Sequence, residues 1–408
     1  MFTKKNLSAN TEAENDRVIT WSFVRLFAGF HFFMLAFSVY NLLPHYLELR
    51  GVSEAKFGAI AGTMGVANMV GILLLGHRAD QWSRKTTVML YMGLGLAANI
   101  IAVLAMNASE NWYFLSRALQ GFSFALGIPI VFAWTLETGP PARRQETMAW
   151  LGVAGLLANS TGPLISETIM SNFPAGGGPW VYTWVFVVSV VFQLMAMLVF
   201  FTAKNSTPER DQESKRRDFL KLMTRKHSYP LLLVMLIFGG LFGVFISFGK
   251  NYAVSIGLNY VSVLFSGYTV GAILSRVYIG PLTRKLTPRH MIFLGLLGIG
   301  ISMLGLSSVS GYLGLALVGG FYGLSHGILY PTVIVRFIET NKKNEMGRAT
   351  ILVQGAFSGG WGLFPYIAGL IVQFTDYQSL FYLLTMTAGG GILIHLWSES
   401  RHRHQGMI

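Results

Sequence analysis

Twelve apolar segments, each close to the length of a membrane-spanning helix or longer, constrain this 408-residue chain more than any other feature. A helix rises about 1.5 Å per residue, so about 20 apolar residues cross the roughly 30 Å hydrocarbon layer of a bilayer. Only 12% of the residues are charged, whereas 52% are hydrophobic. The sequence therefore predicts an all-α membrane protein with twelve transmembrane helices. The expected segments are 21–43, 54–75, 86–106, 111–136, 147–170, 180–202, 230–254, 260–282, 290–309, 312–335, 349–373 and 377–397.

The positions of the basic residues predict how the chain is oriented. With the N-terminus inside, the inner tails and loops hold most of the 31 Lys and Arg residues, whereas the outer loops hold only Arg50 and Lys56. Positively charged loops stay in the cytoplasm, so both termini are expected on the cytoplasmic side of an inner or plasma membrane. Because the net charge of +13 lies in short loops between apolar runs, we expect the lipid bilayer, and no nucleic acid, as partner.

One long polar connection divides the segments into two sets of six. The residues Gln-Gly-Phe-Ser at 120–123 return as Tyr-Gly-Leu-Ser at 322–325, and Pro163 returns as Pro365 at the same offset. Such parallel repeats predict two pseudo-symmetric six-helix halves. The expected regions are a cytosolic tail over 1–20, the first half over 21–203, a cytoplasmic linker over 204–228, the second half over 229–398 and a cytosolic tail over 399–408.

A glycine, an acid and two basic residues stand at fixed spacing between the second and third segments. Their pattern, G-x-x-x-D-x-x-x-R-K, resembles the signature loop after helix two of the major facilitator superfamily. The resemblance implies that Arg84 pairs with Glu137. It also implies that Asp80 faces the start of the eleventh helix, whose dipole stabilises a negative charge by about 0.3–1 kcal/mol. The expected gating motif is Gly76, Asp80, Arg84, Lys85 and Glu137.

The fourth segment contains Arg117 followed by Gln120 and Gly121. This spacing resembles the R-x-x-Q-G motif of the drug:proton antiporter-like branch of that superfamily, whose arginine is implicated in proton coupling. An arginine inside a bundle costs at least a few kcal/mol unless it meets a carboxylate, carbonyls or water. An arginine that only reaches the outer interface remains the alternative. The resemblance implies a fold with the two halves around a central cavity, which opens alternately to the two sides.

Few titratable residues are expected inside the membrane. Glu167, near the outer end of the fifth segment, is the one acid expected there, and the histidines of the first and tenth segments titrate near neutral pH. A membrane histidine that only donates or accepts a hydrogen bond is an equal alternative. The expected proton-coupling residues are Arg117, Gln120, Glu167, His31 and His326.

The charges expected inside the bundle are net positive, which favours an anionic or zwitterionic substrate because charges buried together should compensate. Lys250 and Arg25 are expected to add to the charge of Arg117, and aromatic and amide side chains of the second half are expected to complete the cavity. The expected substrate-cavity residues are Arg25, Asn159, Lys250, Tyr322, Tyr330, Gln354 and Trp361.

The sequence thus predicts a monomeric secondary active transporter that couples a proton gradient to the export of a small anionic or zwitterionic organic molecule, of metallophore or siderophore type. A broad-specificity multidrug:proton antiporter, uptake of an organic anion and a lipid flippase remain alternatives. The chain has no G-x-x-x-x-G-K-[ST] loop, which argues against ATP-driven transport, and no cofactor or metal is expected. We expect no enzyme, because no cluster of nucleophile, base and orienting residue can be assembled.

Overall fold

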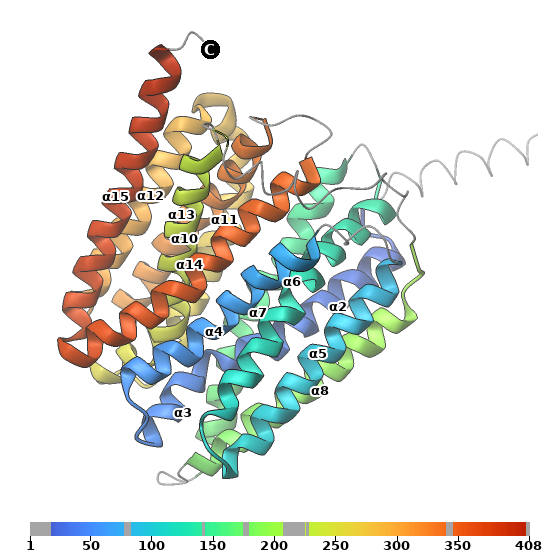
Figure 1. Cartoon of the computed structure of the whole chain (residues 1–408), viewed down its shortest axis with the longest axis vertical. Helices are drawn as coiled ribbons and strands as arrows, with labels where there is room; N and C mark the ends of the chain where they lie inside the picture. Colours follow the sequence, from blue (N-terminus) through green and yellow to red (C-terminus); the bar gives the residue numbers. More distant parts are fainter. Residues whose placement is uncertain are drawn as a thin grey trace, which may run out of the picture.

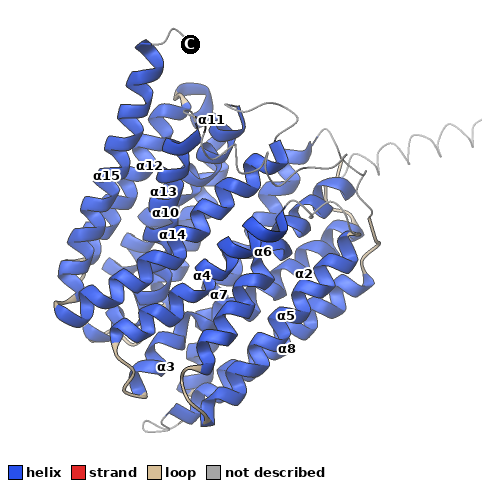
Figure 2. Cartoon of the chain, viewed as in Figure 1, coloured by secondary structure: helices blue, strands red, loops and turns tan. Residues whose placement is uncertain are grey.

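The computed structural model describes residues 18–76, 83–140, 143–173, 179–206, 225, 228–339 and 346–404. All regular secondary structure in these ranges is helical, as Figure 2 shows. Eleven of the described helices are long and apolar enough to cross a membrane. A further helix, α11 (Ser262–Lys285), has 24 residues and would span about 36 Å. The predicted all-α membrane fold is confirmed.

Within each half the helices follow one another with short connections. In the N-terminal half they are α2 (Trp21–Ser38), η1 (Val39–Leu42), α3 (Leu43–Leu49), α4 (Glu54–Leu75), α5 (Arg84–Leu104), η3 (Ala105–Asn107), α6 (Trp112–Thr138), α7 (Arg144–Ser171), η5 (Pro179–Val181) and α8 (Tyr182–Thr202). In the C-terminal half they are α10 (Ser228–Ser255), α11, α12 (Pro288–Leu306), α13 (Tyr312–Glu339), α14 (Met346–Phe374) and α15 (Tyr377–His404).

The structure departs from the expected segments at both ends of the described chain. The first helix breaks after Ser38 into a 3₁₀ turn, and α3 then begins with Pro44 in its first turn, where a missing N–H costs nothing. At the other end α15 runs on to His404, and its Glu399, which is 7% exposed, pairs with Arg336 of α13 at 3.5 Å. Most of the expected tail 1–20 and of the expected linker 204–228 lies outside the described residues.

Two bundles of helices lie side by side in Figure 1, one formed by α2 to α8 and the other by α10 to α15. The bundles touch where α4 packs along α14 and where α7 packs against α11. On α4, a Cβ added at Gly58, Gly62 or Gly65 would meet the backbone of α14. Small residues of this kind let two membrane helices approach closely. We call this boundary between the bundles the seam.

The sequence repeat corresponds to a repeat in packing. Gly121 of α6 lies against the carbonyl of Met64 on α4, and Gly323 of α13 lies against the carbonyl of Tyr268 on α11. In the same way Gly95 of α5 faces the Ser123 hydroxyl, and Gly298 of α12 faces the Ser325 hydroxyl. The two halves therefore use matching positions for matching helix contacts.

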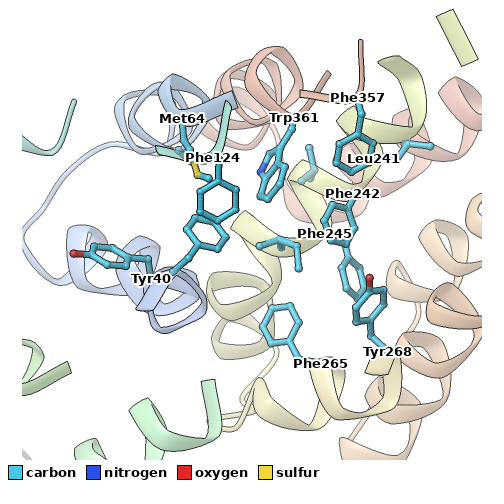
Figure 3. Close-up of a cluster of buried hydrophobic side chains, with 14 of the residues drawn as sticks. Tyr40, Met64, Phe124, Leu241, Phe242, Phe245, Phe265, Tyr268, Phe357 and Trp361 are labelled. Carbon is cyan, nitrogen blue, oxygen red and sulfur yellow. The ribbon is translucent and has the colours of Figure 1, made fainter. Parts of the chain in front are cut away.

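The core of the molecule is aromatic near the seam. Figure 3 shows the Trp361 ring between Phe124 of the N-terminal half and the rings of Phe242 and Phe357 in the C-terminal half. The ring centroids of Trp361 and Phe242 are 5.5 Å apart, and the ring of Phe37 approaches Trp361 from the other half at 5.9 Å. The centre of the protein is therefore a place where aromatic groups meet.

Candidate functional site

We call the side of the bundle opposite the start of α2 and the end of α15 the outer side, in line with the predicted orientation; it is the lower side in Figure 1. There a buried ion pair crosses the seam. Lys250 Nζ of α10 lies 3.4 Å from Glu167 Oε1 of α7, and the two side chains are 4% and 5% exposed. Glu167 also accepts from the backbone N–H groups of Val261, at 2.6 Å, and of Ser262, at 3.2 Å. One carboxylate thus holds α10 and the start of α11 to the N-terminal half.

This ion pair corrects the expected surplus of positive charge. Lys250 is neutralised by Glu167 and donates its other hydrogen bond to the carbonyl of Asn259, so it offers no free charge to a substrate. Arg25 is exposed and bonds the Thr202 carbonyl at 3.3 Å, within the N-terminal half. The expected cluster of cavity cations does not form, because counting charges along the sequence leaves out the partners that folding supplies.

A second polar contact crosses the outer seam, and sequence reasoning missed it. Tyr377 of α15 donates to Glu54 Oε1 of α4 at 3.1 Å, and the Ala55 N–H donates to Gln373 Oε1 of α14 at 3.2 Å. Asn251 of α10 lies beside Glu54 and Tyr377. An acid at the first position of a helix usually stabilises the helix dipole, so the sequence offered no reason to expect that Glu54 contacts another helix. The position of Glu54 on the bundle-facing side of α4 was the one feature that could have indicated this contact.

Arg117 is the buried cation that keeps no carboxylate partner among the described residues. It is 5% exposed, donates from Nη1 to Gln120 Oε1 at 2.8 Å, and places its guanidinium 5.5 Å from the centre of the Phe37 ring. Gln120 Nε2 in turn donates to Asn99 Oδ1 at 3.0 Å. Arg117 Nε has no hydrogen-bond partner within the described ranges. The motif of α6 therefore forms a polar chain that ends in one incompletely bonded cation.

A cavity of about 10 Å³ adjoins this chain, and its size is enough for about one water molecule. It lies within the N-terminal half between α2, α5, α6 and α8. Its walls include Phe33, Phe37, Asn99, Gln120, Ser123 and Gln193.

The corresponding part of the C-terminal half is aromatic. The His326 ring meets Phe238 and Phe242 edge-on, with centroids 4.8 and 4.9 Å away, and its Nδ1 lies 3.2 Å from the Tyr268 hydroxyl. Tyr322 stacks on Phe245 at 4.2 Å. Of the cavity residues expected in this half, Tyr322, Tyr330, Trp361 and Gln354 come together at this aromatic cluster, whereas Lys250 lies at the outer ion pair.

The polar groups of this aromatic region differ in whether they have hydrogen-bond partners. The Tyr330 hydroxyl donates to Gln354 Oε1 at 2.5 Å. By contrast, the buried Tyr322 hydroxyl and the buried Trp361 Nε1 have no partner among the residues that the structure describes. These two buried donors are therefore unsatisfied within the described part of the chain.

Two expected site residues lie outside these clusters. His31 Nδ1 is 2.9 Å from the Ala154 carbonyl, and because a carbonyl only accepts, that nitrogen carries the hydrogen. His31 thereby links α2 to α7 inside the N-terminal half. Asn159 is half-buried in the middle of α7.

On the inner side Arg84 and Glu137 meet as the resemblance implied. Arg84, which is 4% exposed, donates to Glu137 Oε1 at 2.7 and 3.0 Å, and Ser206 donates to Oε2 at 2.6 Å. Lys85 bonds the Ala203 carbonyl at 3.4 Å. Gly76 lies against Ile351 of α14, at the seam. Asp80 is outside the described residues, so its place opposite α14 stays a prediction.

Comparison with known proteins agrees with this architecture. The family model of the Major Facilitator Superfamily matches residues 25–264 and 251–406. Multidrug resistance protein 2 of Bacillus subtilis (strain 168) is 22% identical over 374 residues, which cover 88% of this chain and 91% of that protein. The crystal structure of the nucleoside transporter NupG has a TM-score of 0.73 at 15% identity and covers 93% of this chain and 99% of that one.

A second solved structure adds the same information about the fold. The human organic anion transporter MFSD10 (TETRAN) has a TM-score of 0.60 at 15% identity, and the match covers 91% of this chain and 98% of that chain. At these identities the likeness to solved structures concerns the arrangement of helices alone.

Proposed function

The chain belongs to the Major Facilitator Superfamily, and from this premise we propose that it is a proton-coupled exporter of small organic molecules that join an aromatic body to a carboxylate. Membership of the family establishes that the protein is a multi-pass membrane transporter of small molecules and not an enzyme. The proposal adds the chemical class of the substrate, the direction and the energy source.

The observation that carries the substrate class is Arg117. An unpaired buried cation is costly, because water is removed and no opposite charge replaces it. Arg117 has an unused N–H and lies next to the Phe37 ring, which itself touches Trp361 at the seam. A carboxylate bound beside this guanidinium would supply the missing charge. The expected anionic substrate is therefore kept, with Arg117 in place of Lys250 and Arg25.

The aromatic part of the proposed substrate is inferred from the rings of the C-terminal half. The Trp361 ring lies next to Phe124 of the N-terminal half, as Figure 3 shows, with the rings of Phe242 and Phe357 on its other side. Such rings favour an edge-to-face or offset contact with another ring. Trp361 Nε1 and the Tyr322 hydroxyl would donate to acceptors on such a molecule. A metallophore with aromatic and carboxylate groups is one molecule of this class.

Export is supported by the relative named for multidrug resistance, which matches most of this chain. The outer seam is closed by the Glu167–Lys250 pair, so release to the outside requires this pair to separate. Alternating access of this kind moves two helical halves around a fixed central site. We place both termini in the cytoplasm and the protein in the plasma membrane.

Transport into inverted membrane vesicles tests the proposal. The probes are 2-naphthoate, its neutral amide and a naphthyl trimethylammonium cation, each with and without an imposed proton gradient. We expect accumulation of the naphthoate above that of the other two, and we expect it to collapse when a protonophore removes the gradient. Accumulation that does not respond to the protonophore would contradict proton coupling.

A multidrug:proton antiporter for neutral or cationic compounds is the second candidate function. The name of the Bacillus relative favours it, and so does the neutralisation of Lys250, which removes one cation that would repel such compounds. Faster accumulation of the trimethylammonium probe than of the naphthoate would replace the first candidate with this one.

A further inference from the structure

Two carboxylates of the N-terminal half reach across the outer seam, and they differ in how their oxygens are bonded. Both oxygens of Glu167 accept from donors of the other half, among them Lys250 and the Ser262 N–H, so no neighbour is left to accept a carboxyl proton. Glu54 has a donor on one oxygen, the Tyr377 hydroxyl on Oε1. Its Oε2 is buried and has no partner among the described residues.

The side chain next to Glu54 is incompletely bonded as well. Asn251 is 3% exposed, and neither its Nδ2 nor its Oδ1 has a partner in the described part of the chain. Buried polar atoms without partners are rare and call for an explanation. A proton on Glu54 Oε2 would turn that oxygen into a donor for Asn251 Oδ1. One proton would thereby give both Glu54 Oε2 and Asn251 Oδ1 a hydrogen-bond partner.

The charged groups around Glu54 leave room for such a proton. The further charge that acts on Glu54 is the carboxylate of Glu48 on α3, which is exposed and lies 3.2 Å from His45 Nδ1. Repulsion from that carboxylate disfavours a second negative charge at Glu54. The neighbouring groups are Arg50 bonded to Tyr46, Lys56 paired with Glu110, Lys250 paired with Glu167, Tyr377 itself and Asp376, which accepts from the Ser379 N–H.

We propose that Glu54, Asn251 and Tyr377 form a proton-binding site that joins the two halves on the outer side and takes up a proton from the outer solution when this face closes. When the face opens, α4 separates from α10 and α15, and Glu54 is left in water as a carboxylate. Acid outside then favours closure, which is the step that follows release of an exported substrate. The site rests on the export and proton coupling proposed above, but its protonation can be measured without transport.

The chain has no cysteine, so a pair of spin labels can be placed without background. The labels are introduced as Ser109→Cys and Ser310→Cys, at exposed turns on the outer side of the two halves. The distance between them is measured by double electron–electron resonance on the full chain in lipid nanodiscs across a range of pH. We expect the short-distance, closed population to grow as the pH falls.

The variant Glu54→Gln carries a permanently neutral side chain at this position. We expect it to remain closed at every pH. Its comparison is Glu48→Gln, which removes the exposed carboxylate that repels Glu54: the pH response should remain, with its midpoint at lower pH. A Glu54→Gln protein that opens and closes with the same pH dependence as the unsubstituted chain would overturn the proposal.

A second variant decides the matter where Glu54→Gln fails to fold. Tyr377→Phe removes the donor to the ionised carboxylate, so the proton should bind more readily and the closing midpoint should rise by about one pH unit. Infrared difference spectra should show a protonated carboxyl band in the closed state. An unchanged midpoint together with no such band would refute the site.

The same measurements separate this site from the proposed function. Naphthoate export that ignores the proton gradient, in a protein whose outer face still closes through Glu54, would refute the proposed coupling and leave the site standing. Gradient-driven export in a protein whose closure does not depend on Glu54 would refute the site and leave the function standing.

Discussion

Helices α6 and α13 occupy equivalent positions in the two halves, but the side chains of α6 make polar contacts where those of α13 make aromatic ones. Gly121 and Gly323 make the same close contact with the carbonyl of a neighbouring helix. One position before them, Gln120 continues a polar chain from Arg117, whereas Tyr322 stacks on an aromatic ring. The helices are packed alike, but the side chains at these positions make different contacts.

The same contrast recurs at the outer end of each helix pair. Lys56 of α4 pairs with Glu110 before α6, and at the corresponding positions the ring of Tyr260 lies 6.1 Å from that of Tyr312. Small residues fix the spacing of the backbones, so larger side chains can diverge without changing the fold. Under the proposed function, the N-terminal half would bind the charged group of a substrate and the C-terminal half its ring.

Changing the shared packing should have the largest effect, and it should be equal in the two halves. We expect Gly121→Val and Gly323→Val each to destabilise the protein by about 3 kcal/mol or more, because the new side chain meets backbone that cannot move aside. Thermal unfolding in detergent measures this. Gly93→Val, where a Cβ meets nothing within 4 Å, is the control. Loss of stability in one half only would break the structural equivalence.

Removing the charge of Arg117 should weaken substrate binding far more than changing His326 at the aromatic cluster of the C-terminal half. We expect Arg117→Gln to weaken binding of 2-naphthoate by about 10- to 100-fold, in line with about 1.5–3 kcal/mol for a hydrogen bond to a charged group. Binding of the neutral amide should stay the same. His326→Gln should change naphthoate affinity by less than about threefold, because aromatic rings make its closest contacts. Titration of the purified proteins provides the measurement, with Arg25→Gln as an exposed control.

Substitutions of the uncharged residues Gln120 and Tyr322 should differ by a smaller amount in their effect on stability. Gln120→Leu leaves Asn99 and the Nη1 of Arg117 without their partner, and we expect it to lower stability by about 1–3 kcal/mol. Tyr322→Phe removes a hydroxyl that has no described partner and should change stability by less than about 0.5 kcal/mol. Chemical unfolding of both variants gives the comparison. Equal losses would mean that the Tyr322 hydroxyl is bonded after all.

The smallest effect concerns pH at the outer edge. The hydrogen bond from Lys56 holds the pKa of the Glu110 carboxyl below its usual range. Its contribution to stability is therefore complete above the unfolded pKa and is lost as the pH falls through the lowered folded pKa. Comparing the melting temperature of Glu110→Gln with that of the unsubstituted chain should show a small difference at about pH 7 that starts to shrink only below about pH 4.3, the usual pKa of a glutamate, and is lost in stronger acid. Tyr312→Leu should show no such pH dependence.

The sequence by itself determined the membrane fold. Segment length and apolar composition require helices, because backbone groups in lipid must bond within their own segment. The pairing of Arg84 with Glu137, which is present at 2.7 Å, was implied by the resemblance to the superfamily. The residues that return at one offset, 120–123 at 322–325 and Pro163 at Pro365, identified the two halves. These features are local, or repeat at a fixed offset, and so they can be read along the chain.

Tertiary structure alone decided which charges remain free. Lys250 looked like a substrate cation until folding brought Glu167 within 3.4 Å of it, and Glu54 looked like an ordinary helix start until Tyr377 reached it from α15. The energy of a buried charge depends on its partners within a few ångströms. Those partners come from segments far apart in the sequence, and no pattern along the chain says which of them will meet.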